Sequence, residues 1–245
     1  MLYWKESTFL NLTYDEQNLP INGSLCKKHL QDFWKRFRAR IKSPIKYYGV
    51  GEYGEKSLRP HYHAIIFGWQ ESIDKLSLHR GLDGKRRFSS SLIAELWPLG
   101  NNIVGVVEHD SIQYVCGYIR KKLVGKDAEY YVKNGLAPPF MVNSKGLGKR
   151  YAQDNAFDLA TELTAYEKGK AVGLPRYYTK VLELDSEVLK RKGLEHEQSI
   201  QDYCEEKGWD EKRSAYERRE DRRQRDRNIR GRYRTLDSKD PTQFL

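Results

Sequence analysis

Hydrophobic and polar positions follow patterns that divide the first half of the chain into strands and helices. Apolar and polar side chains alternate along residues 7–15, STFLNLTYD, which predicts a β-strand. The side chains expected on one face of this strand are Phe9, Asn11 and Thr13. From Leu25 to Ile41 the apolar residues recur at steps of three and four, which predicts an amphipathic helix with Ser24 as its N-cap.

A hairpin is predicted next. The segment SPIKYYGVGEYG (43–54) is a turn followed by a second strand. GEKSL (54–58) then reverses the chain into a third strand, which contains RPHYHAIIFG (59–68).

Residues 69–87 are polar, and we expect them to form an insertion loop. A short helix at 88–98 begins with a serine cap and ends at Pro98, a fourth strand follows at 101–109, and another helix follows at 110–123. Asp110 or Ser111 is the expected N-cap of that last helix. The predicted order is β-α-β-β-α-β-α. It indicates an α+β fold of the ferredoxin-like split-βαβ type, an antiparallel sheet with helices on one face.

The second half of the chain has weaker patterns. We expect a catalytic domain at 1–152, a helical extension at 153–205 with a helix over 153–168, and a charged tail at 206–245. Residues 210–234 contain 11 lysines and arginines against 6 aspartates and glutamates and almost no aliphatic side chains. Such a segment buries little surface, so it is a solvated helix, a disordered tail, or a basic arm that holds DNA.

Charge narrows the class of partner. The 245 residues include 44 lysines and arginines against 34 aspartates and glutamates, for a net charge of +10 and a pI near 9.3. That balance favours a polyanionic partner such as nucleic acid, although a ribosome-like or merely soluble basic protein has the same balance. The 17 tyrosines suit stacking on unpaired bases, or they are core residues.

Cysteines and apolar runs indicate the compartment. Three cysteines, far apart in the sequence, predict neither a disulfide framework nor a zinc ribbon, so we expect a reducing compartment. No apolar run is long enough to span a membrane, and MLYWKESTFL lacks the order of a signal peptide. We therefore expect an intracellular protein with no membrane partner.

Two histidines stand one residue apart in RPHYHAIIFG. On a strand, His61 and His63 share one face while Tyr62 lies on the other. Glu52, nine residues upstream, is brought near them by the hairpin. Two imidazoles and a carboxylate can hold Mg²⁺ or Mn²⁺ and leave room for a phosphate oxygen. The alternatives are a pair of half-buried histidines without a ligand and an exposed carboxylate on the hairpin.

The segment YVCGYIRKK carries the second candidate chemistry. Tyr114 and Tyr118 are four residues apart on the predicted helix and share a face, which Lys121 and Lys122 can flank. A tyrosine can attack a phosphodiester and keep the bond as a phosphotyrosine ester, provided that a cation stabilises the developing charge. A lysine adds positive charge beside the phosphate. The alternative is core packing of a tyrosine stripe.

Together these motifs resemble a known family. RPHYHAIIFG resembles the motif of HUH endonucleases, YVCGYIRKK resembles the two-tyrosine motif of rolling-circle replication initiators, and FLNLTYD resembles their first motif. The run over about 7–152 is similar to the initiators of gokushovirus-like bacteriophages, within the microviruses.

The resemblance implies a replication endonuclease that nicks single-stranded origin DNA through a 5′-phosphotyrosine and religates it. His61, His63 and Glu52 would bind Mg²⁺ or Mn²⁺, and Tyr114 and Tyr118 would be the nucleophiles, with Lys121 or Lys122 on the phosphate. It places the protein in the cytoplasm of a bacterial host with no small-molecule substrate. The sequence has no G-x-x-x-x-G-K-[ST] motif, so a host helicase is expected to separate the strands for a host polymerase.

Two other functions use similar parts. Relaxases and transposases share the site chemistry, but the chain is short for a relaxase, and some relaxases place the tyrosine ahead of the histidines. RNA-binding modules use the same β-α-β-β-α-β frame with aromatic residues on the sheet. Here the glycine-aromatic pattern of such modules is not found, and a binding module has no need for paired histidines.

Overall fold

A computed structural model describes residues 3–54, 57–80, 86–122, 126–167 and 170–208, together with residues 220 and 224. Within these ranges it describes only the backbone of residues 86, 109, 110, 118–122, 126–128, 167, 170 and 200. The chain divides into two compact units, of which the first is built on residues 1–145 and the second begins at Gly146.

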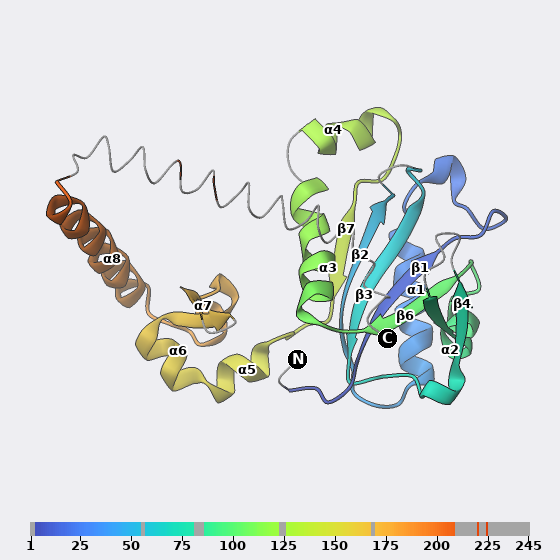
Figure 1. The fold of residues 1–245 in the computed structure, drawn as a ribbon, viewed down its shortest axis with the longest axis horizontal. Coiled ribbons are helices and arrows are strands. Elements are labelled where there is room, and N and C mark those ends of the chain that lie inside the picture. Colours follow the sequence, from blue (N-terminus) through green and yellow to red (C-terminus); the bar gives the residue numbers. More distant parts are fainter. Residues whose placement is uncertain are drawn as a thin grey trace. The chain divides into compact units, whose positions relative to one another are not determined.

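The first unit is built around a seven-stranded sheet with the strand order β4-β5-β6-β1-β3-β2-β7 (Figure 1). Each paired neighbour is antiparallel. The strands are β1 Ser7–Thr13, β2 Lys46–Tyr53, β3 Pro60–Phe67, β4 Leu76–Arg80, β5 Arg86–Ser90, β6 Asn102–Val106 and β7 Phe140–Asn143. The predicted α+β class is therefore confirmed.

The central strands have the split-βαβ topology. Helix α1 (Lys27–Arg40) connects β1 to β2, and β3 lies between these two strands. Helix α2 (Ser91–Leu96) lies in the connection from β3 to β6, and β1 separates that pair. Both connections therefore skip one antiparallel strand, which is the arrangement expected of a ferredoxin-like sheet.

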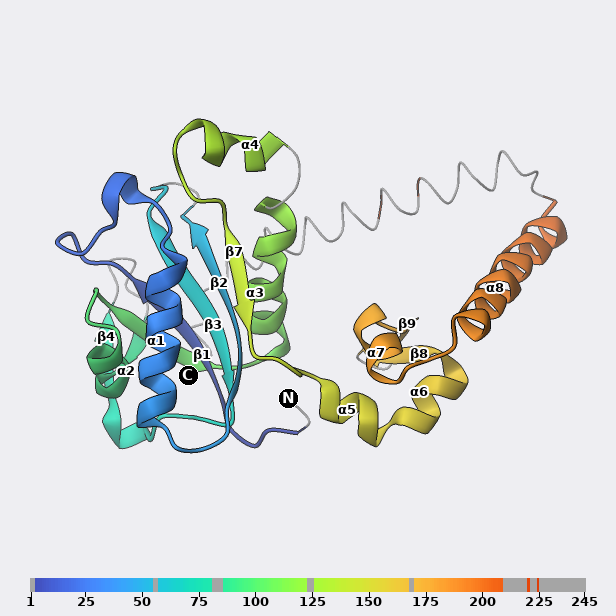
Figure 2. The same cartoon turned by 180° about the vertical axis from the view of Figure 1, so that it is seen from behind.

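Helices cover both faces of the sheet, which corrects the expectation of a single covered face. On one face Tyr62 and Ala64 of β3 belong to a core that includes Phe33 and Phe37 of α1. On the other, Tyr114 of α3 (His109–Lys122) packs against the sheet. Figure 1 shows α3 in front of the sheet, and Figure 2 shows α1 on the reverse side. The reason is that β3 buries nearly every side chain on both of its faces, and a sheet that is apolar on both sides needs cover on both.

Helix α1 is amphipathic, as predicted, with four buried apolar residues, Leu30, Phe33, Trp34 and Phe37. Its N-cap is Cys26, which makes no side-chain capping bond. The predicted cap, Ser24, is wrong because the helix begins at Lys27. The Ser24 hydroxyl instead accepts the backbone N–H of Ala137 at 2.9 Å, which ties the start of α1 to the segment before β7.

The expected insertion loop at 69–87 is also wrong, since it contains β4 and the beginning of β5. These strands form the edge of the sheet and β4 is mostly exposed, so the apolar signal in LSLHR is weak. The predicted serine cap of the short helix is confirmed, because the Ser90 hydroxyl accepts the Ile93 N–H at 3.1 Å. Ser90 also donates to the buried carboxylate of Glu71 at 2.6 Å.

The second unit has a small core of Ala152, Leu159 and Ala165. The single helix expected over 153–168 is divided. Helix α6 ends at Leu163, which takes a left-handed φ of 50°, and a strand follows. The elements of this unit are α5 Lys149–Asp154, α6 Ala156–Glu162, β8 Thr164–Glu167, β9 Lys170–Gly173, α7 Arg176–Val181 and α8 Ser186–Glu206. The remaining elements of the first unit are α4 Lys126–Lys133 and two short 3₁₀ turns, Ile21–Gly23 and Ile73–Lys75.

The cysteines form no disulfide framework, as expected, because Cys26, Cys116 and Cys204 are all free. Within the part of the chain that the structure describes, no helix combines the length and apolarity needed to cross a bilayer. The tail from 206 lies almost entirely outside the described residues, and the division into three domains stays a prediction.

Candidate metal centre

Strand register brings three candidate ligands together on the face that α3 covers. In the hairpin of β2 and β3, Glu52 pairs with His61 and Val50 pairs with His63. Residues that pair directly across antiparallel strands share a face, as do residues two apart along a strand. Glu52, His61 and His63 therefore project from one face, as the alternation in the sequence predicts.

The ligand atoms converge. Oε1 of Glu52 lies 3.2 Å from Nε2 of His61 and 3.1 Å from Nε2 of His63. One ligand atom from each residue lies within 4.8 Å of the others, and among the residues that the structure describes this is the only group of three that could hold a metal. Two imidazole nitrogens and one carboxylate oxygen form a donor set that suits a divalent cation such as Mn²⁺ or Mg²⁺.

Glu52 is the charged member of this group and is only 1% exposed, so it is not an exposed hairpin carboxylate. Burial acts to raise the pKa of Glu52, but the hydrogen bonds and charges of the two histidines outweigh burial and lower the pKa to about 2. The side chain is therefore a carboxylate at neutral pH. A buried negative charge of this kind attracts a cation to the site.

The backbone orients His61. Its Nδ1 lies 3.1 Å from the carbonyl oxygen of Arg59. A carbonyl can only accept a hydrogen bond, so Nδ1 carries the proton and Nε2 faces Glu52. Metal-binding histidines commonly donate their second nitrogen in this way, which sets the ring orientation and leaves the other nitrogen available to a cation.

Helix α3 places Tyr114 beside the histidines. The ring of Tyr114 lies 5.2 Å from the ring of His63, edge to face, and 6.4 Å from the ring of Phe9. The tyrosine is half-buried. Tyr118, Lys121 and Lys122 fall within the bounds of α3, but their side chains lie outside the described residues.

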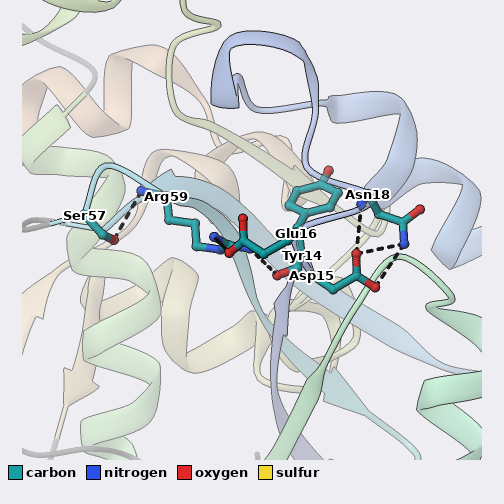
Figure 3. A network of polar contacts seen from close by, with 6 residues as sticks. All are labelled: Tyr14, Asp15, Glu16, Asn18, Ser57 and Arg59. Carbon is teal, nitrogen blue, oxygen red and sulfur yellow. Dashed lines mark hydrogen bonds and ion pairs between the residues drawn. The ribbon is translucent and has the colours of Figure 1, made fainter.

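Two further residues adjoin the site and were not singled out in the sequence. Asn11 of β1 pairs with His63, and its Oδ1 is buried without a hydrogen-bond partner among the described residues. Arg59 precedes the histidine strand and binds Glu16 and the carbonyl of Tyr14 (Figure 3). The alternation of residues 7–15 puts a polar Asn11 on an otherwise apolar position, which is the signal that could have identified it.

Known proteins similar to this chain share one description. A family model described as replication-associated protein ORF2 matches residues 7–123. Replication-associated protein VP4 of Bdellovibrio phage phiMH2K is 30% identical over 223 residues, which cover 83% of this chain and 69% of that protein. Replication-associated protein ORF2 of Spiroplasma virus 4 is 30% identical over 73% of this chain and 58% of its own length.

A third relative, replication-associated protein ORF4 of Chlamydia phage 1, is 32% identical over 73% of this chain and 46% of its own length. The chain thus spans about half of the second and third relatives. No solved structure matches the chain. The matched residues 7–123 include the two histidines, Glu52 and the whole of α3. The chain therefore belongs to the ORF2 family of replication-associated proteins, which includes proteins of small phages.

Proposed function

We propose that the protein starts rolling-circle replication of a small phage by nicking single-stranded origin DNA with a tyrosine. The observation that carries this proposal is the position of the Tyr114 ring against His63, beside the group formed by Glu52, His61 and His63. A metal-binding group and a phenol that share one face of a sheet are the two parts needed for phosphodiester transfer.

The residues fit a divalent cation. Glu52 is charged and buried, and Nε2 of each histidine faces it at hydrogen-bond distance. When bound, Mg²⁺ or Mn²⁺ would polarise the phosphate and stabilise the charge that develops on its oxygens. The contribution of this chain is to hold the ligands on a rigid hairpin, with the Arg59 carbonyl fixing the tautomer of His61.

In the proposed reaction the phenol oxygen of Tyr114 bonds to phosphorus and the bond from phosphorus to the 3′ oxygen breaks. The phenol proton leaves Tyr114, and the 3′ oxygen takes up a proton to become a free hydroxyl that primes synthesis by a host polymerase. Lys121 or Lys122 offsets the charge of the phosphate. The energy of the broken bond is kept in the 5′-phosphotyrosine ester.

Tyr118 lies four residues after Tyr114 in the same helix, so the two positions share one helical face. The first tyrosine is already esterified after one round, so the second would cut the regenerated origin and allow the released strand to be circularised. A host helicase would separate the strands, and the reaction would take place in the bacterial cytoplasm.

The test is a nicking assay on single-stranded DNA of the genome that encodes the chain. The protein is incubated with Mn²⁺, with Mg²⁺, or with EDTA, and the products are resolved on a denaturing gel. We expect a discrete nick and a protein–DNA adduct only in the presence of metal. Nicking that persists in EDTA and in the His61→Ala/His63→Ala double variant would refute the proposed role of the metal group, while binding without any cleavage would favour a nucleic-acid-binding module.

A further inference from the structure

The side chain of Arg59 makes two contacts beside the metal group. Its Nη1 lies 2.6 Å from Oε1 of Glu16, and its Nη2 donates to the carbonyl oxygen of Tyr14 at 2.9 Å. Figure 3 shows this side chain extending from the β2–β3 hairpin toward Glu16 and the Tyr14 backbone at the end of β1. The guanidinium is therefore held at a defined place between the two segments.

This place adjoins the proposed reaction centre. The Gly54 N–H donates to the Arg59 carbonyl at 3.0 Å, which extends the hairpin one step beyond the first residue of β3. Arg59 stands two residues before His61, so the two share a strand face and lie about 7 Å apart along the strand. A DNA strand whose phosphate sits at the histidines would bring a neighbouring phosphate near the guanidinium.

Stability alone gives little reason for the ion pair. The Glu16 side chain is 83% exposed and that of Arg59 is 32% exposed. Ion pairs with this degree of exposure to solvent contribute little to folding. A guanidinium has five N–H donors in a planar fork, and the contacts among the described residues use two of them. The remaining donors can bind an oxyanion.

We infer that Arg59 binds a backbone phosphate next to the scissile one, and that Glu16 is an internal competitor which the phosphate displaces. The inference rests on the proposed function, because it takes single-stranded DNA as the ligand. Carboxylate and phosphate both match the fork of a guanidinium, and a phosphate in the groove brings further contacts of its own strand that Glu16 lacks. The hydrogen bond to the Tyr14 carbonyl keeps the guanidinium oriented during the exchange.

The exchange predicts opposite effects for the two members of the ion pair. Affinity is measured by fluorescence anisotropy of a labelled single-stranded oligonucleotide, in EDTA and over a range of salt concentrations. Arg59→Ala should weaken binding about tenfold, as expected for one charge-assisted contact. It should also reduce the slope of log affinity against log salt by about 0.7, which corresponds to one phosphate contact on a single strand. Glu16→Gln should tighten binding about two- to fivefold, because the competitor is weakened.

Two controls separate exchange from general electrostatics. Asp15→Asn removes a neighbouring negative charge whose carboxylate binds Asn18 rather than Arg59, so it should tighten binding less than Glu16→Gln does. In the Arg59→Ala/Glu16→Gln double variant the gain from Glu16→Gln should disappear, because the two side chains act through one contact. Thermal unfolding of each variant verifies that it is folded.

If Arg59→Ala and Glu16→Gln shift affinity in the same direction, or the gain from Glu16→Gln survives without Arg59, the inference is wrong. Both results are read in EDTA and do not depend on cleavage. Absence of metal-dependent nicking by the wild-type protein would instead overturn the proposed function. Failure of the wild-type protein to bind the oligonucleotide at all would overturn both.

Discussion

The two faces of β3 treat polar side chains in opposite ways. On the α1 face, the Tyr62 hydroxyl is 2.6 Å from that of Tyr14, donates to the Cys26 carbonyl at 2.9 Å, and accepts the Cys26 N–H at 3.1 Å. On the α3 face, His61 and His63 both approach one oxygen of Glu52. Tyr62 is saturated by protein partners, whereas the histidines and Glu52 gather donors that a cation can use.

Strand alternation makes this separation possible. One step along β3 moves a side chain from a packed aromatic core to the proposed reaction centre. Burial raises the pKa of Tyr62 to about 12, so its hydroxyl stays neutral and structural. Burial of Glu52 is instead outweighed by two histidines, which keep it charged. The same strand therefore supports both stability and chemistry with side chains that do not overlap in role.

The largest effect is expected for His61→Ala. Loss of one ligand should reduce metal-dependent nicking about a thousandfold or more, because the metal contributes several kcal/mol to transition-state stabilisation. The melting temperature should change little, since His61 is partly exposed and lies outside the α1 core. Initial rates at several Mn²⁺ concentrations check this, and full activity at low Mn²⁺ would remove His61 from the site.

A second effect concerns Glu52 and acid. Its pKa in the folded protein, about 2, lies below the ordinary value of 4.5 for a glutamate. The stabilising contribution of the ionised group is therefore complete above about pH 4.5 and is lost as the pH falls toward 2. We expect the wild-type protein to become less resistant to urea across this window, and the Glu52→Gln variant to lack that part of the dependence. Identical pH profiles would show that the histidines do not hold the charge of Glu52.

These predictions depend on features that differ in how far the sequence reveals them. The shared face of His61 and His63 follows from alternation, and the approach of Glu52 follows from a short hairpin, so both are local in the chain. The pairing of Asn11 with His63, and of Arg59 with Glu16, requires the register of β1 against β3. Those segments are about fifty residues apart, and no local pattern determines their register.

The misassigned elements have similar causes. Strands β4 and β5 lie at the edge of the sheet, where half-exposed residues weaken the apolar alternation. Ser24 resembles an N-cap in sequence, but its hydroxyl binds the backbone of Ala137, more than a hundred residues away. The second covering helix of the sheet is implied by the nearly continuous apolar run after His63, a pattern typical of strands buried on both faces.

A moderate effect is expected for Tyr62→Phe, the counterpart of the histidine variant on the opposite face. Removal of the hydroxyl leaves the buried N–H and carbonyl of Cys26 without this partner, which should lower the free energy of unfolding by about 1–3 kcal/mol. Nicking at a temperature where the variant is folded should remain within a few-fold of wild type. A collapse of nicking without loss of stability would contradict the separation of the two faces.

The smallest effect is expected on the outer surface of α1. Lys28 and Asp32 form an exposed ion pair of 2.6 Å. Because such pairs are solvated, Lys28→Ala should change the free energy of unfolding by less than about 0.5 kcal/mol. Chemical denaturation compares this variant with Tyr62→Phe. A change as large as that of Tyr62→Phe would mean that the stability of this face does not lie in its buried contacts.

The central claim is that the α3 face transfers a DNA phosphate to a tyrosine. The most direct measurement is adduct formation by Tyr114→Phe, Tyr118→Phe and the double variant on single-stranded origin DNA, with peptide mapping of the modified residue. Phenylalanine keeps the ring that packs against His63, so any loss reports on the hydroxyl. We predict that each single variant keeps some adduct and that the double variant forms none. A covalent adduct in the double variant would place the nucleophile elsewhere and return both tyrosines to packing.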